Sequence, residues 1–253
     1  MPAFTDRHVL VTGASRGLGR AIVRGFVAAG ARVTVLARDA TSAETTRAEL
    51  GAHACVFADV TDADGLTRAL EEAAARSGPI EILVNNAGGA DTAPLARVDV
   101  DALRAMMALN VEPVLTAIRA VAPAMKAAGT GRVVTIASTA GLKGYAYASA
   151  YSAAKHAVVG LTRSLALELA KTGITVNAVC PGYADTDLVA GSLDALEKKT
   201  GRPRTDLLAE FTKGNPQGRL VHPDEVADCV LWLAGDGASA VTGQAIAIAG
   251  GEI

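Results

Sequence analysis

The sequence is poor in aromatic residues and has no cysteine pattern. Four Phe, four Tyr and one Trp occur among 253 residues, so we expect an aliphatic core. The three cysteines, Cys55, Cys180 and Cys229, are far apart and show no Cys-x-x-Cys spacing, which predicts small buried thiols in a reducing cytoplasm. The histidines are equally scattered and form no ligand cluster, so we predict no metal site.

Extreme charge and long apolar runs are also absent. The formal net charge is −2, and acidic and basic residues are interspersed, which predicts no nucleic-acid partner. No uninterrupted run of ~18 apolar residues occurs, and the first residues form no apolar signal region. We therefore expect a cytoplasmic protein with no membrane-spanning segment.

Apolar runs alternate with helical patterns along the whole chain, and half of the residues are hydrophobic. This alternation predicts one α/β domain over residues 1–253, a Rossmann-like doubly wound parallel sheet of about seven strands with helices on both faces. Residues 183–217 are polar and lack such a pattern, so we expect an irregular, mobile substrate lid there. The expected strands are 8–11, 32–37, 52–58, 80–84, 132–138, 175–180 and 244–249, and the main helices are 20–29, 42–50, 62–77, 99–128, 149–171 and 223–234.

A glycine-rich turn joins the first expected strand to the first expected helix. A strand, such a turn, a helix and a second strand form the context of a dinucleotide site, in which glycines admit the pyrophosphate to the helix N-terminus. The spacing Gly-x-x-x-Gly-x-Gly is not the commonest fingerprint, and a glycine-rich turn without a ligand is the alternative. The candidate cofactor contacts in this turn are Gly13, Ser15, Arg16, Gly17, Leu18 and Gly19.

The end of the second strand indicates which nicotinamide cofactor binds. An acidic residue there would bind the ribose 2′-hydroxyl of NAD(H), but that position is Ala37, and Arg38 follows it. Arg16 and Arg38 together favour a 2′-phosphate and therefore NADP(H) over NAD(H). Asp39, one residue later, argues in the opposite direction, and Arg38 is equally typical of a solvated loop.

Polar residues follow three other expected strands. Asp59, with Val60 beside it, could bind the adenine amino group or could cap the next helix together with its neighbour Thr61. The turn with Asn86, Ala87 and Gly88 would support the cofactor site, either as structure or by direct contact. Ser138 ends the fifth strand, where open α/β sheets bind ligands.

Tyr151 and Lys155 lie on one face of an expected helix, one turn apart. A nearby ammonium lowers the pKa of a phenol, so Tyr151 could exchange a proton with a developing alkoxide. Taken alone, this pair is more typical of a surface helix with a snorkelling lysine. Pro113 should kink the helix 99–128 near Asn110 and free a backbone carbonyl there, although a kinked core helix has the same pattern.

Together these stretches resemble the short-chain dehydrogenase/reductase family over essentially the full chain. The resemblance is strongest to the β-ketoacyl (acyl-carrier-protein or CoA) and polyketide ketoreductase branch, on Thr172–Gly182 and the Arg16/Arg38 pair. The matching motifs are Thr12–Gly19, Asn85–Gly88, Asn110, Ser138, Tyr151-x-x-x-Lys155 and Pro181-Gly182.

The resemblance implies a role for each catalytic candidate. Tyr151 would exchange the proton, Lys155 would lower its pKa and hold the nicotinamide ribose, and Ser138 would polarise the substrate carbonyl. The Asn110 carbonyl would bind a water that links Lys155 to solvent. The cofactor contacts would also include Tyr151, Lys155, Pro181, Gly182 and Thr186, the last on the nicotinamide carboxamide.

The function expected from this resemblance is NADP(H)-dependent reduction of a 3-oxoacyl thioester or a related ketone. Basic lid residues, among them Arg202 and Arg204, would bind the phosphates of a CoA or acyl-carrier thioester, although a solvated loop has the same composition. Oxidation of a secondary alcohol (a 3-hydroxyacyl-CoA, a polyol or a steroid) and a non-catalytic, cofactor-binding regulator are the alternatives. The family also implies a homotetramer built through the helices around 103–126 and 151–171.

Overall fold

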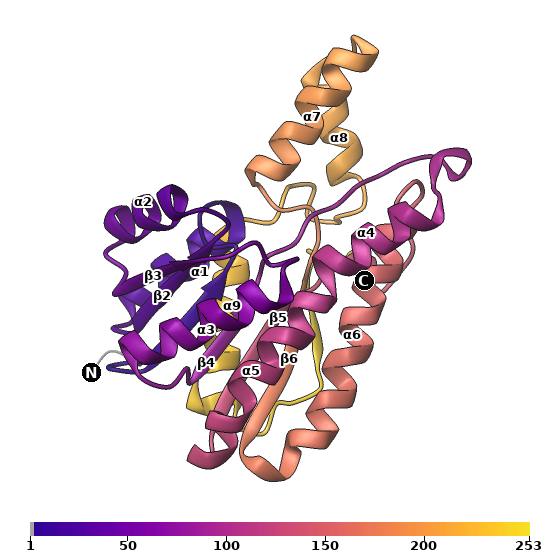
Figure 1. Ribbon diagram of the computed structural model, residues 1–253. Helices are drawn as coiled ribbons and strands as arrows, with labels where there is room; N and C mark the ends of the chain where they lie inside the picture. Colours follow the sequence, from indigo (N-terminus) through magenta and orange to yellow (C-terminus); the bar gives the residue numbers. More distant parts are fainter. Residues whose placement is uncertain (1–2) are drawn as a thin grey trace.

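The computed structural model describes residues 3–253 and contains the expected parallel sheet at its centre (Figure 1). The sheet has seven strands in the order β3-β2-β1-β4-β5-β6-β7, and every neighbouring pair is parallel. The chain reverses its direction of travel across the sheet between β1 and β4, which places a crevice at their carboxyl ends. The strands are β1 (His8–Thr12), β2 (Arg32–Ala37), β3 (Ala54–Phe57), β4 (Ile82–Asn85), β5 (Gly131–Ile136), β6 (Ile174–Pro181) and β7 (Ala245–Ile248).

Helices cover both faces of the sheet, as the sequence predicted. One apolar core lies between the sheet and α1 with α9, and a second lies under α3, α5 and α6. In Figure 1 the hairpin of α7 and α8 extends away from the sheet. The helices are α1 (Gly17–Ala28), α2 (Ala40–Leu50), α3 (Ala63–Ser77), α4 (Val100–Asn110), α5 (Glu112–Ala128), α6 (Ser149–Leu169), α7 (Asp187–Thr200), α8 (Arg204–Thr212) and α9 (Pro223–Ala234), with short 3₁₀ turns at Leu95–Arg97, Thr139–Gly141, Ala170–Thr172 and Asp236–Ala238.

Several element boundaries differ from the sequence prediction. Helix α1 begins at Gly17 rather than Arg20, so the last two glycines of the turn belong to its first turn. Strand β5 ends at Ile136, two residues before Ser138. Ser138 instead caps a 3₁₀ turn, where its hydroxyl accepts a hydrogen bond from the Ala140 N–H at 3.0 Å.

The expected kinked helix over 99–128 is two helices. Val111 ends α4 and begins α5 with φ −116° and ψ −53°. Pro113 lies in the first turn of α5, where its missing N–H leaves no intrahelical hydrogen bond unmade. The predicted position of the distortion, near Asn110, is therefore confirmed, but the chain breaks there rather than bends.

Residues Val100–Ala128 also pass a test of length and apolar composition for a membrane span, with a mean hydropathy of 1.3. The sequence analysis did not identify this segment, because it looked for an uninterrupted apolar run. The test considers only length and composition, and 44% of its most apolar window is buried inside the fold. Core helices of soluble proteins pass the same test.

The region 183–217 is not irregular, which corrects the sequence prediction. Most of it forms the α7–α8 hairpin, which we call the lid hairpin. A small apolar cluster holds its two helices together: Val189, Leu193 and Leu207 are buried, and Leu196, Leu208, Phe211 and Leu220 pack against them. Val189, Leu193 and Leu196 recur at helical spacing, so the sequence analysis missed a signal that was present.

Candidate active site

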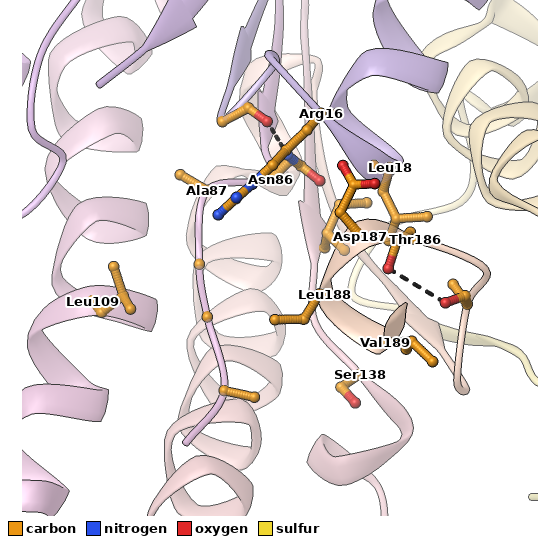
Figure 2. A pocket seen from close by; sticks show the side chains of 18 of the residues that line it. Arg16, Leu18, Asn86, Ala87, Leu109, Ser138, Thr186, Asp187, Leu188 and Val189 are labelled. Carbon is orange, nitrogen blue, oxygen red and sulfur yellow. Dashed lines mark hydrogen bonds between the residues drawn. The ribbon is translucent and has the colours of Figure 1, made fainter. Parts of the chain in front are cut away.

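A cleft of about 1510 Å³ lies at the carboxyl end of the sheet. Figure 2 shows it between the glycine-rich turn, the Asn86–Ala87 turn and the start of α7, with Ser138 nearby. The structure brings all the predicted cofactor-binding residues and three of the four predicted catalytic residues to this one cleft. Its lining includes Gly13, Ser15, Arg16, Gly17, Leu18, Gly19, Arg38, Asp59, Val60, Asn86, Ala87, Gly88, Ser138, Tyr151, Lys155, Pro181, Gly182 and Thr186.

The backbone of the glycine-rich turn packs closely against itself and against the backbone of the turn after β4. A Cβ on Gly13, whose φ is +62°, would lie 2.8 Å from the Ala87 Cα, and a Cβ on Gly19 would lie 2.3 Å from the Gly13 carbonyl oxygen. Two glycines are thus required by the packing of the turn itself. This packing joins the turn after β1 to the turn after β4.

Two polar side chains form hydrogen bonds between the turn after β1 and the turn after β4. The Thr12 Oγ1 accepts hydrogen bonds from the N–H groups of Asn86 and Ala87, each at 3.0 Å. The Asn86 amide donates to the carbonyls of Thr12 and Gly13 at 3.0 and 2.9 Å. Asn86 therefore has the structural role that the sequence left open, and Thr12 is a positioning residue that the sequence analysis missed.

Helix α1 presents an uncapped N-terminus to the cleft. The side chain of Arg16 at its N-cap makes no capping hydrogen bond, and the first turn contains no acidic residue. By contrast, Asp39, Asp62 and Asp99 cap α2, α3 and α4. An uncapped N-terminus has free N–H groups and a positive dipole end, so its chemistry fits the pyrophosphate of a dinucleotide.

The two arginines expected at the ribose line the same cleft. Ala37 ends β2 and is buried, so no acidic residue stands at the strand end. Asp39 also lines the cleft, but its carboxylate accepts the N–H and hydroxyl of Ser42, each at 2.9 Å. These hydrogen bonds lower the pKa of Asp39 and direct its carboxylate towards α2.

Asp59 makes a local turn. Its carboxylate accepts hydrogen bonds from the Thr61 N–H and hydroxyl at 2.9 and 2.7 Å. The cap of α3 is Asp62, whose side chain accepts from the Gly65 N–H at 3.0 Å. The predicted capping role therefore belongs to Asp62, while Asp59 and Val60 remain on the wall of the cleft.

Tyr151, Lys155 and Ser138 form the polar end of the cleft. The Lys155 Nζ lies 5.8 Å from the centre of the Tyr151 ring and donates to the Ile136 carbonyl at 3.0 Å. Burial lowers the pKa of Lys155 to about 8. Lys155 is only 5% exposed, so it is not the snorkelling surface lysine of the alternative interpretation.

The pKa of Tyr151 differs from the sequence prediction. Burial raises it above the ordinary value, and a hydrogen bond with Ser138 opposes that rise. The expected net lowering is not found in this structure, because desolvation by burial is the largest cause of the shift and Lys155 is not among its causes. Tyr151 is consequently a protonated phenol at neutral pH.

Asn110 is the one predicted catalytic residue outside the lining of the cleft. It is buried beneath the turn after β4, where its amide nitrogen donates to the carbonyls of Gly89 and Met106 at 3.0 and 3.1 Å. A Cβ on Gly88 would lie 2.7 Å from the Asn110 Oδ1 and 3.6 Å from the Lys155 Nζ. The Asn110 side chain and the Lys155 ammonium therefore both lie next to Gly88.

The start of α7 forms another wall. The Thr186 Cγ2 lies 3.3 Å from the position of a Cβ on Gly17, so the lid hairpin begins against the glycine-rich turn (Figure 2). The Thr186 hydroxyl donates to the Ala184 carbonyl at 3.3 Å. Pro181 and Gly182, which end β6, complete this wall.

An aromatic wall of Tyr145, Tyr183 and Phe211 closes the substrate side of the cleft. Tyr183 packs edge-on against Tyr145 at 6.3 Å and against Phe211 at 4.7 Å between ring centres. The sequence analysis missed all three residues. They come from separate elements at irregular separations, so no local pattern marks them.

The cysteines are free thiols, and only Cys180 is fully buried; Cys55 and Cys229 are partly exposed. The expectation of three buried thiols is thus wrong for two of them. Within residues 3–253, no group of three or more His, Cys, Asp or Glu side chains is placed to hold a metal ion.

Comparison with known proteins identifies the family. The short chain dehydrogenase family matches residues 7–197. The chain is a member of the short-chain dehydrogenase family. It is 40% identical over 259 residues to a putative ketoacyl reductase of Streptomyces coelicolor, covering 98% of both chains.

Two further relatives differ in what their names describe. A cis-4-hydroxycyclohexanecarboxylate dehydrogenase of Sinomonas cyclohexanicum is 41% identical over 253 residues, covering 98% of this chain and 97% of its own. The crystal structure of a variant actinorhodin polyketide ketoreductase with NADPH superposes with a TM-score of 0.92 at 38% identity, covering 98% of both chains. The protein is therefore an oxidoreductase of this family acting on ketones or alcohols.

Proposed function

We propose that this protein reduces a ketone with NADP(H), with Tyr151 as the proton donor. The observation that carries the proposal is that Tyr151, Lys155 and Ser138 line the same cleft as an uncapped helix N-terminus. A phenol that keeps its proton at neutral pH holds the proton that ketone reduction requires.

Each proposed catalytic residue would have a separate role in the reaction. A nicotinamide cofactor bound in the cleft would supply the hydride to the carbonyl carbon. Ser138 would donate a hydrogen bond to the carbonyl oxygen, and Tyr151 would transfer its proton to that oxygen as charge develops. Lys155 would hold the ribose and offset the phenolate left behind, and a water on the Asn110 carbonyl would return a proton towards it.

Preference for NADP(H) is supported by charge at the ribose end of the cleft. Arg16 and Arg38 both line it, and the carboxylate of Asp39 is engaged with Ser42. Two guanidiniums would make charge-assisted hydrogen bonds to a 2′-phosphate. The related ketoreductase crystallised with NADPH agrees with this assignment.

The substrate we propose is a 3-oxoacyl thioester or a similar ketone, as the name of the Streptomyces relative suggests. The lid hairpin would cover it. Arg202 and Arg204, the predicted phosphate contacts, are paired with Glu210 and Asp194 within the hairpin. Lys199 is the basic residue of the hairpin that lines the cleft.

A ring-shaped ketone or alcohol is the second candidate. The aromatic wall presents flat apolar surface to the cleft, together with Leu188 and Val189 of the lid hairpin. Such a surface suits a ring better than an extended chain. The relative named for a hydroxycyclohexanecarboxylate acts on a substrate of this shape.

A substrate panel scored by NADPH absorbance tests these proposals. It would contain acetoacetyl-CoA, a linear ketone and cyclohexanone, with NADPH and NADH, and the alcohols with the oxidised cofactors. We expect NADPH-dependent reduction to exceed NADH-dependent reduction and alcohol oxidation at pH 7. Tight NADPH binding without turnover of any member would contradict the proposal and favour a cofactor-binding regulator.

The double variant Arg202→Ala/Arg204→Ala distinguishes the two substrate classes. Loss of activity on acetoacetyl-CoA alone would support phosphate binding by the hairpin. Equal losses on acetoacetyl-CoA and cyclohexanone would remove that role, because breaking the ion pairs would have disturbed the hairpin itself. Glu210→Gln is the matched control, since it breaks one pair and retains the cation.

We also propose a cytoplasmic homotetramer. Free cysteines suit a reducing compartment. Exposed apolar side chains on the long helices, such as Leu103, Leu115 and Leu167, would be covered by neighbouring subunits. Sedimentation of the purified protein tests the assembly, and a monomer would contradict it.

A further inference from the structure

Glu252 is a buried carboxylate that the proposed mechanism does not use. It follows β7, and its side chain is 5% exposed. The Oε1 accepts the Tyr145 hydroxyl at 2.5 Å and lies 3.0 Å from the Lys143 Nζ. A buried charge is costly unless it is paired and hydrogen-bonded, and here a phenol and an ammonium satisfy it.

The same carboxylate lies against both ends of the lid region 183–217. A Cβ on Gly182, just before this region, would lie 3.2 Å from the Glu252 Oε2. A Cβ on Gly214, where the chain returns from the hairpin, would lie 2.9 Å from the Oε1. Glu252 thus occupies the space between the segments that enter and leave the lid hairpin.

The segment before Glu252 contacts the returning chain as well. A Cβ on Gly250 would lie 2.0 Å from the Asn215 Oδ1. The Asn215 side chain also accepts the Gln217 N–H and donates to the Arg219 carbonyl, each at 2.8 Å. Residues 250–252 and 214–219 therefore pack as one unit at the base of the hairpin.

Tyr145 connects this unit to the cleft. Its hydroxyl pairs with the Thr139 Oγ1 at 2.7 Å, one residue after Ser138, and its ring begins the aromatic wall. Burial raises the pKa of Tyr145, and the nearby Glu252 raises it further, so the phenol stays protonated and donates to the carboxylate. The ring of Tyr145 is held in place through Glu252.

We propose that Glu252 is a positioning residue for the substrate. By holding Lys143, Tyr145 and the two ends of the lid region, it fixes the aromatic wall against which the ketone binds. It therefore sets substrate affinity, and the selectivity between ring-shaped and extended ketones, rather than the rate of the chemical step. This inference rests on the proposed ketone-reductase function.

Kinetics on the best ketone of the panel test the proposal with Glu252→Ala and the isosteric Glu252→Gln. We expect Glu252→Ala to raise KM about tenfold, with kcat changed by less than about twofold and NADPH affinity retained. Glu252→Gln, which retains one acceptor, should have a smaller effect in the same direction. A lowered kcat with an unchanged KM would overturn the proposal. Glu197→Gln, on an exposed face of α7, is the matched control and should behave as wild type.

A double variant tests whether Glu252 acts through Tyr145. If the two share one hydrogen bond, Glu252→Ala/Tyr145→Phe should have about the KM of the more affected single variant, because each substitution removes that bond. Additive effects on KM would contradict the proposed connection.

Amide hydrogen exchange provides a readout without any substrate. Glu252→Gln should speed exchange in residues 139–148 and 183–217 and leave β1–α1 unchanged, whereas unchanged exchange in the first two segments would overturn the proposal. If wild type reduces no ketone but exchange changes as expected, the proposed function fails and the positioning role of Glu252 on the hairpin stands. If Glu252→Ala does not fold, Glu252→Gln alone decides the outcome.

Discussion

The two sides of the cleft are built differently. On the nucleotide side, glycines in close backbone contact and the hydrogen bonds of Thr12 and Asn86 join two neighbouring strand ends. On the substrate side, the edge-on contacts of the aromatic wall and the buried carboxylate of Glu252 connect segments far apart in the chain.

Under the proposed function, this difference would separate cofactor binding from substrate choice. A turn held by backbone contacts tolerates few side chains and suits a cofactor that does not change. A wall held by a few side chains can change its shape by single substitutions. Tyr151 and Ser138 lie where the two sides meet, so variants there should separate chemistry from binding.

The largest effect should come from Tyr151→Phe. Loss of the proton donor should lower kcat by about 10²–10⁴-fold, while the NADPH dissociation constant, measured by fluorescence, should stay within about twofold. Tyr147→Phe removes an exposed phenol that also lines the cleft, so it shows whether the loss of kcat is specific to the Tyr151 hydroxyl. Near-normal turnover of Tyr151→Phe would remove Tyr151 from its proposed role.

The next effect concerns the nucleotide side alone. The double variant Arg16→Ala/Arg38→Ala should weaken NADPH binding about 10- to 100-fold through lost charge-assisted hydrogen bonds, and leave NADH binding unchanged. Arg104→Ala, on an exposed face of α4, is the control. Equal weakening for both cofactors would show that these arginines do not read a 2′-phosphate.

A third effect is on stability, and it concerns Lys155. Burial lowers the pKa of Lys155 from 10.5 to about 8, so the folded state favours the neutral amine. Above pH 10.5 both states hold the neutral amine. As pH falls towards 8 the unfolded chain gains the proton first, so wild type loses about 3 kcal/mol of stability, at about 1.4 kcal/mol per pKa unit.

Lys155→Met should therefore be inactive but more stable than wild type at pH 7. Allowing about 1 kcal/mol for the lost hydrogen bond to Ile136, we expect a Tm higher by about 4–8 °C. The gain should shrink as pH rises from 8 to 10.5. Calorimetry across this range measures it, and a lower Tm for the variant at pH 7 would contradict the account.

The sequence predicted the nucleotide side well because its signals are local. The glycine-rich turn, the Asn86 turn and the ends of parallel strands each depend on a short stretch, and the sheet brings those ends together. The direction of the Tyr151 pKa shift was not predictable from the Tyr-Lys spacing, because it depends mainly on burial.

The substrate side was largely unpredictable because its contacts are not local in the sequence. Tyr145 and Glu252 are 107 residues apart, and neither belongs to a repeating pattern. The lid hairpin is held by a small apolar cluster and by salt bridges between exposed side chains. Its helical spacing was overlooked because the segment is mostly polar. Contacts of this kind become visible only when the fold brings distant residues together.

The most direct test of ketone reduction is to follow the transferred hydrogen. The enzyme would be run with NADPH deuterated at the transferable C4 position and the best ketone of the panel, in ordinary water. The account predicts one deuterium on the carbinol carbon of the product, because hydride moves directly to the carbonyl carbon while the Tyr151 proton goes to oxygen. A carbinol carbon without deuterium would contradict it.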